Sequence, residues 1–157
     1  MQSVGIISDG KTGLCYNFLK NSGAVEPMVI EMKNAENFAI NILEILPEEW
    51  YNLKKDSMLL ISDDEKNIGK YLKNQSLCVI SCGLSGKASV SLSSMDGGKT
   101  VVCILRSIFT LKGKEIIPQE FTVKADVDSL TMFPLLASVT ALLLCGVPKK
   151  TIETLQF

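Results

Sequence analysis

The sequence predicts an α/β domain of three layers, with a mainly parallel sheet flanked by helices and an antiparallel strand extension. Three observations carry this prediction. Strand-like and helix-like patterns alternate over the first half of the chain, strand-like runs joined by short turns dominate the second half, and a long apolar helix follows them. The length of 157 residues suits one domain, residues 1–157, that buries a substantial core.

Apolar runs and amphipathic spacings alternate in the first half. The runs SVGIIS, MVIE and SMLLIS are short, and the last is typical of a strand covered on both faces. Phe38, Ile42 and Ile45 recur at helical spacing and predict an amphipathic helix. The expected strands are residues 3–8, 28–31 and 57–62, and the expected helices are residues 12–21, 34–46 and 64–72, with one further helical turn at 48–53.

Four strand-like runs separated by turn residues fill most of the second half, which is why we expect antiparallel pairing there. An apolar helix follows, with Gly146 as its C-terminal cap and Pro148 as its stop. The expected strands are residues 76–82, 88–94, 100–110 and 115–123, the expected helix is residues 130–145, and a last amphipathic turn or two covers residues 149–155.

Residues 129–148 form a stretch without any charged side chain, which raises the question of a membrane span. Pro134 and Gly146 bracket an apolar helix of about twelve residues, and such a helix is roughly 18 Å long. A bilayer core needs about 30 Å. We therefore expect a buried core helix and no membrane span.

The composition excludes several classes of function. Sixteen basic and 17 acidic residues give a net charge of −1, which argues against nucleic-acid binding and against an anionic membrane surface. Histidine is absent, so His-based acid–base catalysis, Ser–His and Cys–His nucleophile pairs and imidazole zinc sites are excluded. Arg106 is the single arginine, a composition that fits an AT-rich bacterial genome. We expect no catalytic residue of these kinds.

The cysteines indicate a reducing compartment. Their number is odd, no Cys-x-x-Cys pattern occurs, and the N-terminal residues read as a strand instead of a signal peptide. We expect reduced, mostly buried thiols in a cytoplasmic protein. The five cysteines are Cys15, Cys78, Cys82, Cys103 and Cys145.

Residues 5–12 (GIISDGKT) match the phosphate-loop pattern Gly-x-x-x-x-Gly-Lys-[Ser/Thr]. They also lie between an expected strand and an expected helix, as that loop requires. In a working loop the backbone N–H groups around Gly10 would wrap a phosphate, Lys11 would neutralise it and Thr12 would hold Mg²⁺.

Two features of the same stretch weaken the match. Ile6 and Ile7 resemble the interior of a strand, which would shorten the phosphate cradle. Asp9 would place a carboxylate where the anion should bind. A strand–turn–helix corner with an Asp-Gly turn is therefore the favoured interpretation, and a degenerate but functional P-loop that binds ATP and Mg²⁺ is the alternative.

Asp63 and Asp64 end the apolar run of residues 57–62. Two carboxylates at the carboxyl end of a parallel strand can hold Mg²⁺ opposite a phosphate loop. An aspartate in this place can equally cap the helix that follows, and we favour the cap. Cys78 and Cys82 lie on one face of an expected strand, where core packing is the favoured interpretation over a metal site.

The order of the pieces is more informative than any single motif. An apolar strand ends in residues 61–64 (ISDD), a strand runs into a glycine at 78–83, antiparallel strands follow, and the helix at 134–148 closes with Gly-Val-Pro. With residues 7–12 (ISDGKT) as a worn Gly-Thr-Asn-Gly-Lys-Thr loop, the chain resembles the central, ATP-binding domain of the Mur ligase family. That family joins amino acids to cell-wall precursors.

The resemblance implies the fold but argues against the ligase activity. Ile7 stands where the family has the first glycine of its loop, and Ile61 stands where the family has the Asn that meets adenine. Residues 23–34 leave almost no room for the segment that supplies the family's metal-binding Glu and His. The flanking precursor-binding and amino-acid-binding domains of the family have no counterpart in the 157 residues.

We therefore expect a degenerate, stand-alone Mur ligase-like domain that acts as a non-catalytic binding or interaction module linked to cell-envelope synthesis. Its partner would be an unidentified protein or a second copy in a homodimer, and no cofactor is expected. The alternative is a small Mg-nucleotide-binding enzyme or switch that uses Gly10, Lys11 and Thr12 on phosphate and Asp63 or Asp64 on Mg²⁺.

Overall fold

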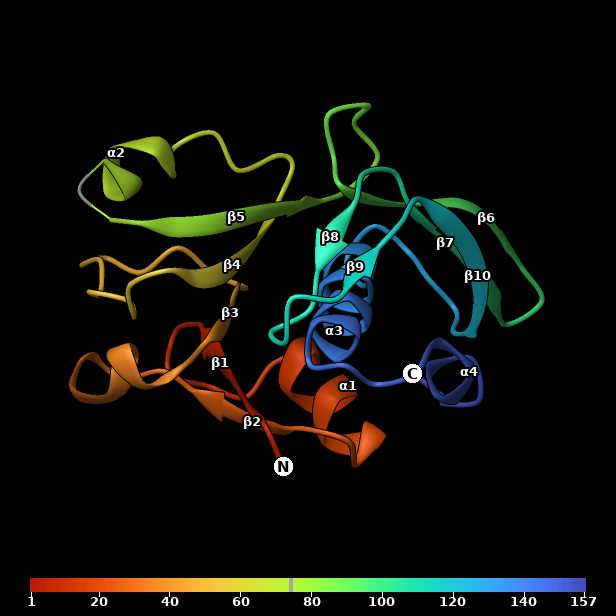
Figure 1. Cartoon of the computed structure of the whole chain (residues 1–157), viewed down its shortest axis with the longest axis horizontal. Coiled ribbons are helices and arrows are strands. Elements are labelled where there is room, and N and C mark those ends of the chain that lie inside the picture. The colour runs from red at the N-terminus through yellow and green to blue at the C-terminus, as the bar shows by residue number, and fades with distance from the viewer. Residues whose placement is uncertain (74) are drawn as a thin grey trace.

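Eight strands form one mixed, mostly parallel sheet that packs against helices (Figure 1). The computed structural model describes residues 1–73 and 75–157. The strands are β1 (Ser3–Ile7), β2 (Glu26–Val29), β3 (Ile40–Leu43), β4 (Ser57–Ser62), β5 (Leu77–Cys82), β6 (Val90–Asp96), β7 (Lys99–Ile104), β8 (Ile108–Phe109), β9 (Glu115–Ile116) and β10 (Gln119–Lys124). The helices are α1 (Leu14–Ser22), α2 (Gly69–Leu72), α3 (Met132–Leu144), α4 (Lys149–Ile152) and the 3₁₀ helix η1 (Met32–Asn37).

The strand order is β10-β7-β6-β5-β4-β3-β1-β2. In this sheet order, the neighbours among β6, β5, β4, β3, β1 and β2 pair in parallel. The neighbours among β6, β7 and β10 pair antiparallel. The short strands β8 and β9 form a separate hairpin. The parallel sheet and its antiparallel extension are thus confirmed.

The two faces of the sheet carry separate apolar clusters because successive side chains of a strand point to opposite faces. In β1, Ile6 belongs to the cluster beneath α1 and α3, and Ile7 belongs to the cluster on the other face. In β4, Leu60 and Leu59 divide in the same way. The second face is covered by η1, by α2 and by the segment that carries Trp50, rather than by long helices.

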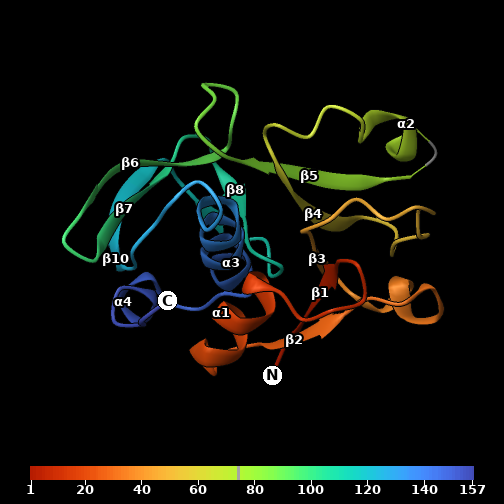
Figure 2. The ribbon, with the colours of Figure 1, turned by 180° about the vertical axis from the view of Figure 1, so that it is seen from behind.

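Helix α3 is the centre of the larger cluster. Every residue from Pro134 to Leu144 is buried, and the sheet curves around the helix with α1 alongside it (Figures 1 and 2). The helix has 13 residues, close to the length expected from its bracketing Pro134 and Gly146. Within residues 1–73 and 75–157, none of the helices is both long and apolar enough to span a membrane.

The helix predicted over residues 34–46 is wrong. Residues 32–37 form η1, and residues 40–43 form β3 in the middle of the parallel sheet, between β1 and β4. All four residues of β3 are buried, and three of them are apolar, with Asn41 the polar exception. Periodicity cannot separate such a short apolar run from a helix.

Several other elements differ from the prediction. The helix expected at 64–72 covers only Gly69–Leu72, and no helix forms at 48–53. The strands expected at 100–110 and 115–123 each divide into two, so that the hairpin β8–β9 separates from the sheet. Pro118 lies at the second break, where it has no N–H to offer to a strand ladder.

Candidate functional site

A cleft of about 630 Å³ lies at the carboxyl ends of the first three parallel strands. From β1 the chain passes to β2 on one side, while β3 lies on the other side of β1, so this edge is a switch point of the topology. Ligands of open α/β sheets bind at such points. The cleft is lined by Ser8, Asp9, Gly10, Ile30, Glu31, Ile45, Leu46, Pro47, Glu48 and Tyr51.

The turn after β1 is closed by its own side chains. The Ser8 hydroxyl donates a hydrogen bond to the Lys11 carbonyl oxygen at 3.0 Å, and the Lys11 N–H donates to Oδ1 of Asp9 at 3.2 Å. Gly10 has a φ of +86°, a conformation that glycine adopts without strain. Gly10 lines the cleft, whereas Lys11 and Thr12 are exposed outside its wall.

Glu44 is the site residue that the sequence analysis missed. It follows the last residue of β3, next to β1, and its carboxylate packs against Gly13, the residue that precedes α1. Oε1 of Glu44 accepts a hydrogen bond from the Cys15 N–H at 3.4 Å. The carboxylate therefore sits at the N-terminus of α1, the place where a phosphate loop holds its anion.

Glu44 was missed because a helix was predicted at residues 34–46. Glu44 was therefore not expected at the end of a strand. A strand that ends in a carboxylate next to a Gly-Lys-Thr turn would have been the signal for this residue. Oε2 of Glu44 is buried and has no hydrogen-bond partner within the part of the chain that the structure describes. Burial raises the pKa of this carboxyl, and the hydrogen bonds from the Cys15 and Leu14 backbone partly oppose that rise.

We expect Glu44 to make the stability of the protein depend on pH. A carboxyl whose pKa is higher in the folded state binds its proton more tightly there, so its contribution is fully present below the unfolded value and is lost as pH rises through the folded value. Wild-type protein should therefore gain stability relative to Glu44→Gln as pH falls from 7 towards 4.

Urea unfolding at several pH values checks this expectation. Glutamine keeps an acceptor oxygen for the Cys15 N–H but cannot titrate, so the difference between the two proteins isolates the carboxyl. Glu48→Gln changes an exposed carboxylate on the same segment and serves as the control. A wild-type-minus-Glu44→Gln difference that is flat from pH 7 to pH 4 would contradict the burial of this charge.

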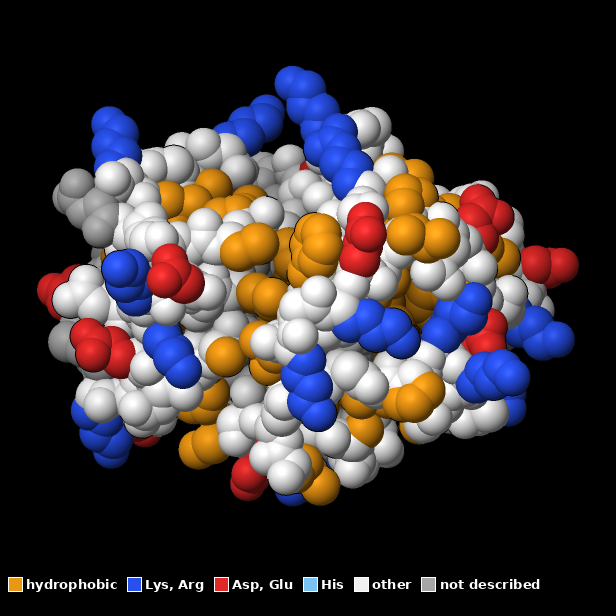
Figure 3. All heavy atoms as spheres, viewed as in Figure 1, with side chains coloured by type: hydrophobic (Ala, Val, Ile, Leu, Met, Phe, Trp, Pro, Cys, Tyr) orange, Lys and Arg blue, Asp and Glu red, His pale blue; other side chains and the backbone are white. Residues whose placement is uncertain are grey.

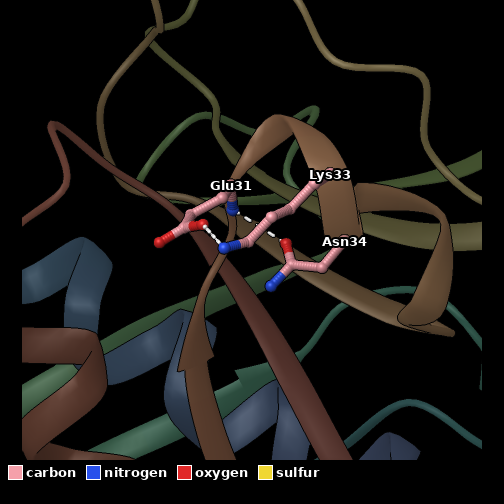
Figure 4. Close-up of polar contacts among 3 residues, drawn as sticks. All are labelled: Glu31, Lys33 and Asn34. Atoms are coloured by element: carbon pink, nitrogen blue, oxygen red, sulfur yellow. Dashed lines mark hydrogen bonds and ion pairs between the residues drawn. The ribbon is translucent and has the colours of Figure 1, made fainter.

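The opposite wall of the cleft begins with Glu31. Its backbone N–H donates to Oδ1 of Asn34 at 2.8 Å, and its carboxylate pairs with Lys33 Nζ at 2.8 Å (Figure 4). The ion pair raises the pKa of the exposed Lys33 ammonium. With Asp9 and Glu48 also in the lining, the cleft carries acidic groups without a lysine or arginine among its lining residues.

Asp63 and Asp64 lie at the end of β4, separated from β1 by β3. The ends of β4 and β1 are therefore separated by two strand spacings, which amount to about 10 Å. Oδ2 of Asp63 accepts a hydrogen bond from the Ser85 N–H at 2.6 Å, so this carboxylate fastens the loop after β5. The predicted helix cap is wrong, because α2 begins at Gly69 with Ile68 before it.

Most of the cysteines are buried or half-buried. Cys15, Cys82 and Cys103 are buried, as expected, but Cys78 is exposed. Burial raises the pKa of the Cys82 thiol to about 12 and that of Cys145 to about 11, so both are protonated at neutral pH. A protonated thiol is a poor nucleophile and a poor metal ligand.

Taken together, the fold and the cleft define an α/β protein with a switch-point cleft that carries acidic side chains beside a closed Gly-Lys-Thr turn. Among residues 1–73 and 75–157, no three His, Cys, Asp or Glu side chains are grouped as metal ligands. The sequence matches no model of a known protein family and no curated protein. Function is therefore inferred from the residues of the chain itself.

Proposed function

We propose that this chain is a non-catalytic, Mur ligase-like binding or interaction module linked to cell-envelope synthesis. The observation that carries the non-catalytic part is the Glu44 carboxylate at the N-terminus of α1. A phosphate loop uses that N-terminus and its backbone N–H groups to hold an anion. Here the Glu44 carboxylate already lies at the N-terminus of α1 and neutralises its partial positive charge.

The charges around the turn support the same proposal. Asp9 already accepts the Lys11 N–H, one of the backbone donors that a phosphate loop would supply. The lining residues Asp9, Glu31 and Glu48 add negative charge at the cleft, and the Lys33 ammonium is paired with Glu31. Lys11 is exposed outside the lining, and the acidic side chains of the lining disfavour a polyphosphate.

We expect Mg–ATP at millimolar concentration to leave the melting temperature unchanged, and we expect no ATP hydrolysis. A ligand at 100 times its Kd would add about 2.7 kcal/mol of stability. For a chain of this size that gain corresponds to a rise of several degrees, which differential scanning fluorimetry resolves readily.

Matched lysine variants make this experiment decisive. A rise in melting temperature that Lys11→Ala removes would contradict the proposal and would place nucleotide at the turn after β1. Lys20→Ala changes an exposed lysine in the last turn of α1 and should behave like wild type. The same pair of variants applies to any ATP hydrolysis that is found.

A second candidate function is the Mg-nucleotide-binding enzyme or switch that uses Gly10, Lys11 and Thr12 on phosphate. The observation that favours it is the buried, unpartnered Oε2 of Glu44 beside the turn. Hard oxygen ligands suit Mg²⁺, and Glu44 fits this role better than Asp63, whose carboxylate is engaged by Ser85. Stabilisation by Mg–ATP that both Lys11→Ala and Glu44→Gln abolish would favour this candidate over the first.

A further inference from the structure

A second cavity, of about 340 Å³, lies between the β8–β9 hairpin, β10 and the C-terminal end of α3. Its lining shares no residue with the switch-point cleft. Figure 3 shows apolar side chains gathered on this face of the molecule over the hairpin, with lysine or arginine side chains beside them. A ligand in this cavity would therefore contact none of the residues that line the switch-point cleft.

The walls of the cavity are mostly apolar. Phe121 of β10 is only 5% exposed, whereas Ile117, between β9 and β10, is 60% exposed and leaves apolar surface open to solvent. The hairpin is held over the helix by the Leu111 N–H, which donates to the Leu144 carbonyl oxygen at 2.8 Å. The apolar lining residues are Ile116, Ile117, Phe121, Leu143, Val147 and Pro148.

Two lysines also line the cavity. Nζ of Lys149 donates a hydrogen bond to Oε1 of Gln119 at 3.0 Å, and both residues line the cavity, so the ammonium is held at its wall. Lys114 of the hairpin lines it as well. Neither lysine forms an ion pair within the described residues, although Glu115 is also in the lining. The cationic groups therefore outnumber the acidic one.

We propose that this cavity binds a small amphipathic carboxylate, namely a short aliphatic acid whose tail lies against the apolar wall and whose carboxylate meets Lys149 and Lys114. Ligand cavities combine an apolar lining with a few polar groups that fix orientation, and the volume is at the small end of their range, which suits a short tail. Lysine ammonium groups act as point charges and can neutralise one carboxylate without bidentate geometry. A phosphate without a tail would leave the apolar wall exposed to water.

Sodium octanoate is the probe for this proposal. Titrated into ¹⁵N-labelled protein, it should shift the amide resonances of residues such as Ile117, Gly146 and Lys149 in a saturable way. Octan-1-ol, with the same tail and no charge, and acetate, with the charge and almost no tail, should each bind at least about tenfold more weakly, a difference of about 1.4 kcal/mol.

Lysine variants separate the proposed contact from a general charge effect. Lys149→Gln should raise the Kd for octanoate about tenfold. Lys150→Gln removes the neighbouring charge of α4, which is outside the lining, and should leave the Kd unchanged. Both lysines are exposed, so both variants should fold, and Ile117→Ser offers a separate test of the apolar wall.

Three kinds of result would overturn the proposal. One is the absence of saturable shifts around the cavity with octanoate at millimolar concentration. Another is equal binding of octan-1-ol and octanoate, or equal weakening by Lys149→Gln and Lys150→Gln, because either would remove the carboxylate from the contact. The third is a peptide with a C-terminal leucine that binds more tightly than octanoate, because the site would then belong to a protein partner.

Discussion

Replacing Leu142 with alanine should lower the free energy of unfolding by about 2–5 kcal/mol. Leu142 is fully buried in α3, the helix around which the sheet curves. The substitution removes buried apolar atoms and leaves a cavity that the sheet and α1 cannot close fully. Because domains are stable by only about 5–15 kcal/mol, a large share of the total would be lost.

Urea unfolding followed by circular dichroism measures this loss. Leu130→Ala is the matched control, since Leu130 is 79% exposed just before the same helix, and its effect should stay within about 0.5 kcal/mol. Equal effects of the two substitutions would mean that α3 is not the buried centre of the domain.

Replacing Gly5 with alanine should destabilise the protein by about 1–3 kcal/mol through overpacking. A Cβ atom at Gly5 would lie 2.6 Å from Cδ1 of Ile30, 2.8 Å from Cγ of Phe38 and 2.9 Å from Oδ1 of Asn41. All three side chains are buried, so none of them can move aside without disturbing the core.

A glycine without neighbours provides the control for Gly5. In Gly69→Ala the new Cβ meets no atom within 4 Å, and Gly69 is an exposed position of α2. That substitution should stabilise the protein by about 0.4–1 kcal/mol, because it restricts the unfolded chain. Opposite signs in thermal unfolding are the expected result, and a neutral Gly5→Ala would contradict the close packing of β1.

Gly5 also explains why the phosphate-loop pattern was ambiguous. The pattern requires glycine at this place in the sequence, but in the structure Gly5 is an interior residue of β1 that pairs with β2 and β3. Glycine is required at this position because a Cβ atom would lie too close to Ile30, Phe38 and Asn41. A sequence pattern shows that a glycine is present. It does not show whether phosphate binding or core packing requires that glycine.

Most of the elements could be predicted because local signals were strong. The apolar runs of β1 and β4, the Asp-Gly turn at Gly10 and the bracketing of α3 by Pro134 and Gly146 each reflect local chemistry. Strand β3 could not be predicted in this way. Its four residues are buried because β3 lies in the middle of the sheet, between β1 and β4, with an apolar cluster packed on each face.

The candidate site, like the fold, could be predicted only in part from the sequence. The sequence alone determined an α/β fold with an antiparallel extension, a Gly-Lys-Thr turn between a strand and a helix, and the absence of histidine chemistry. Only the tertiary structure brought Glu44 to the N-terminus of α1 and kept Asp63 away from it. The physical reason is that sheet order decides which strand ends are neighbours, and sheet order depends on contacts between residues far apart in the chain.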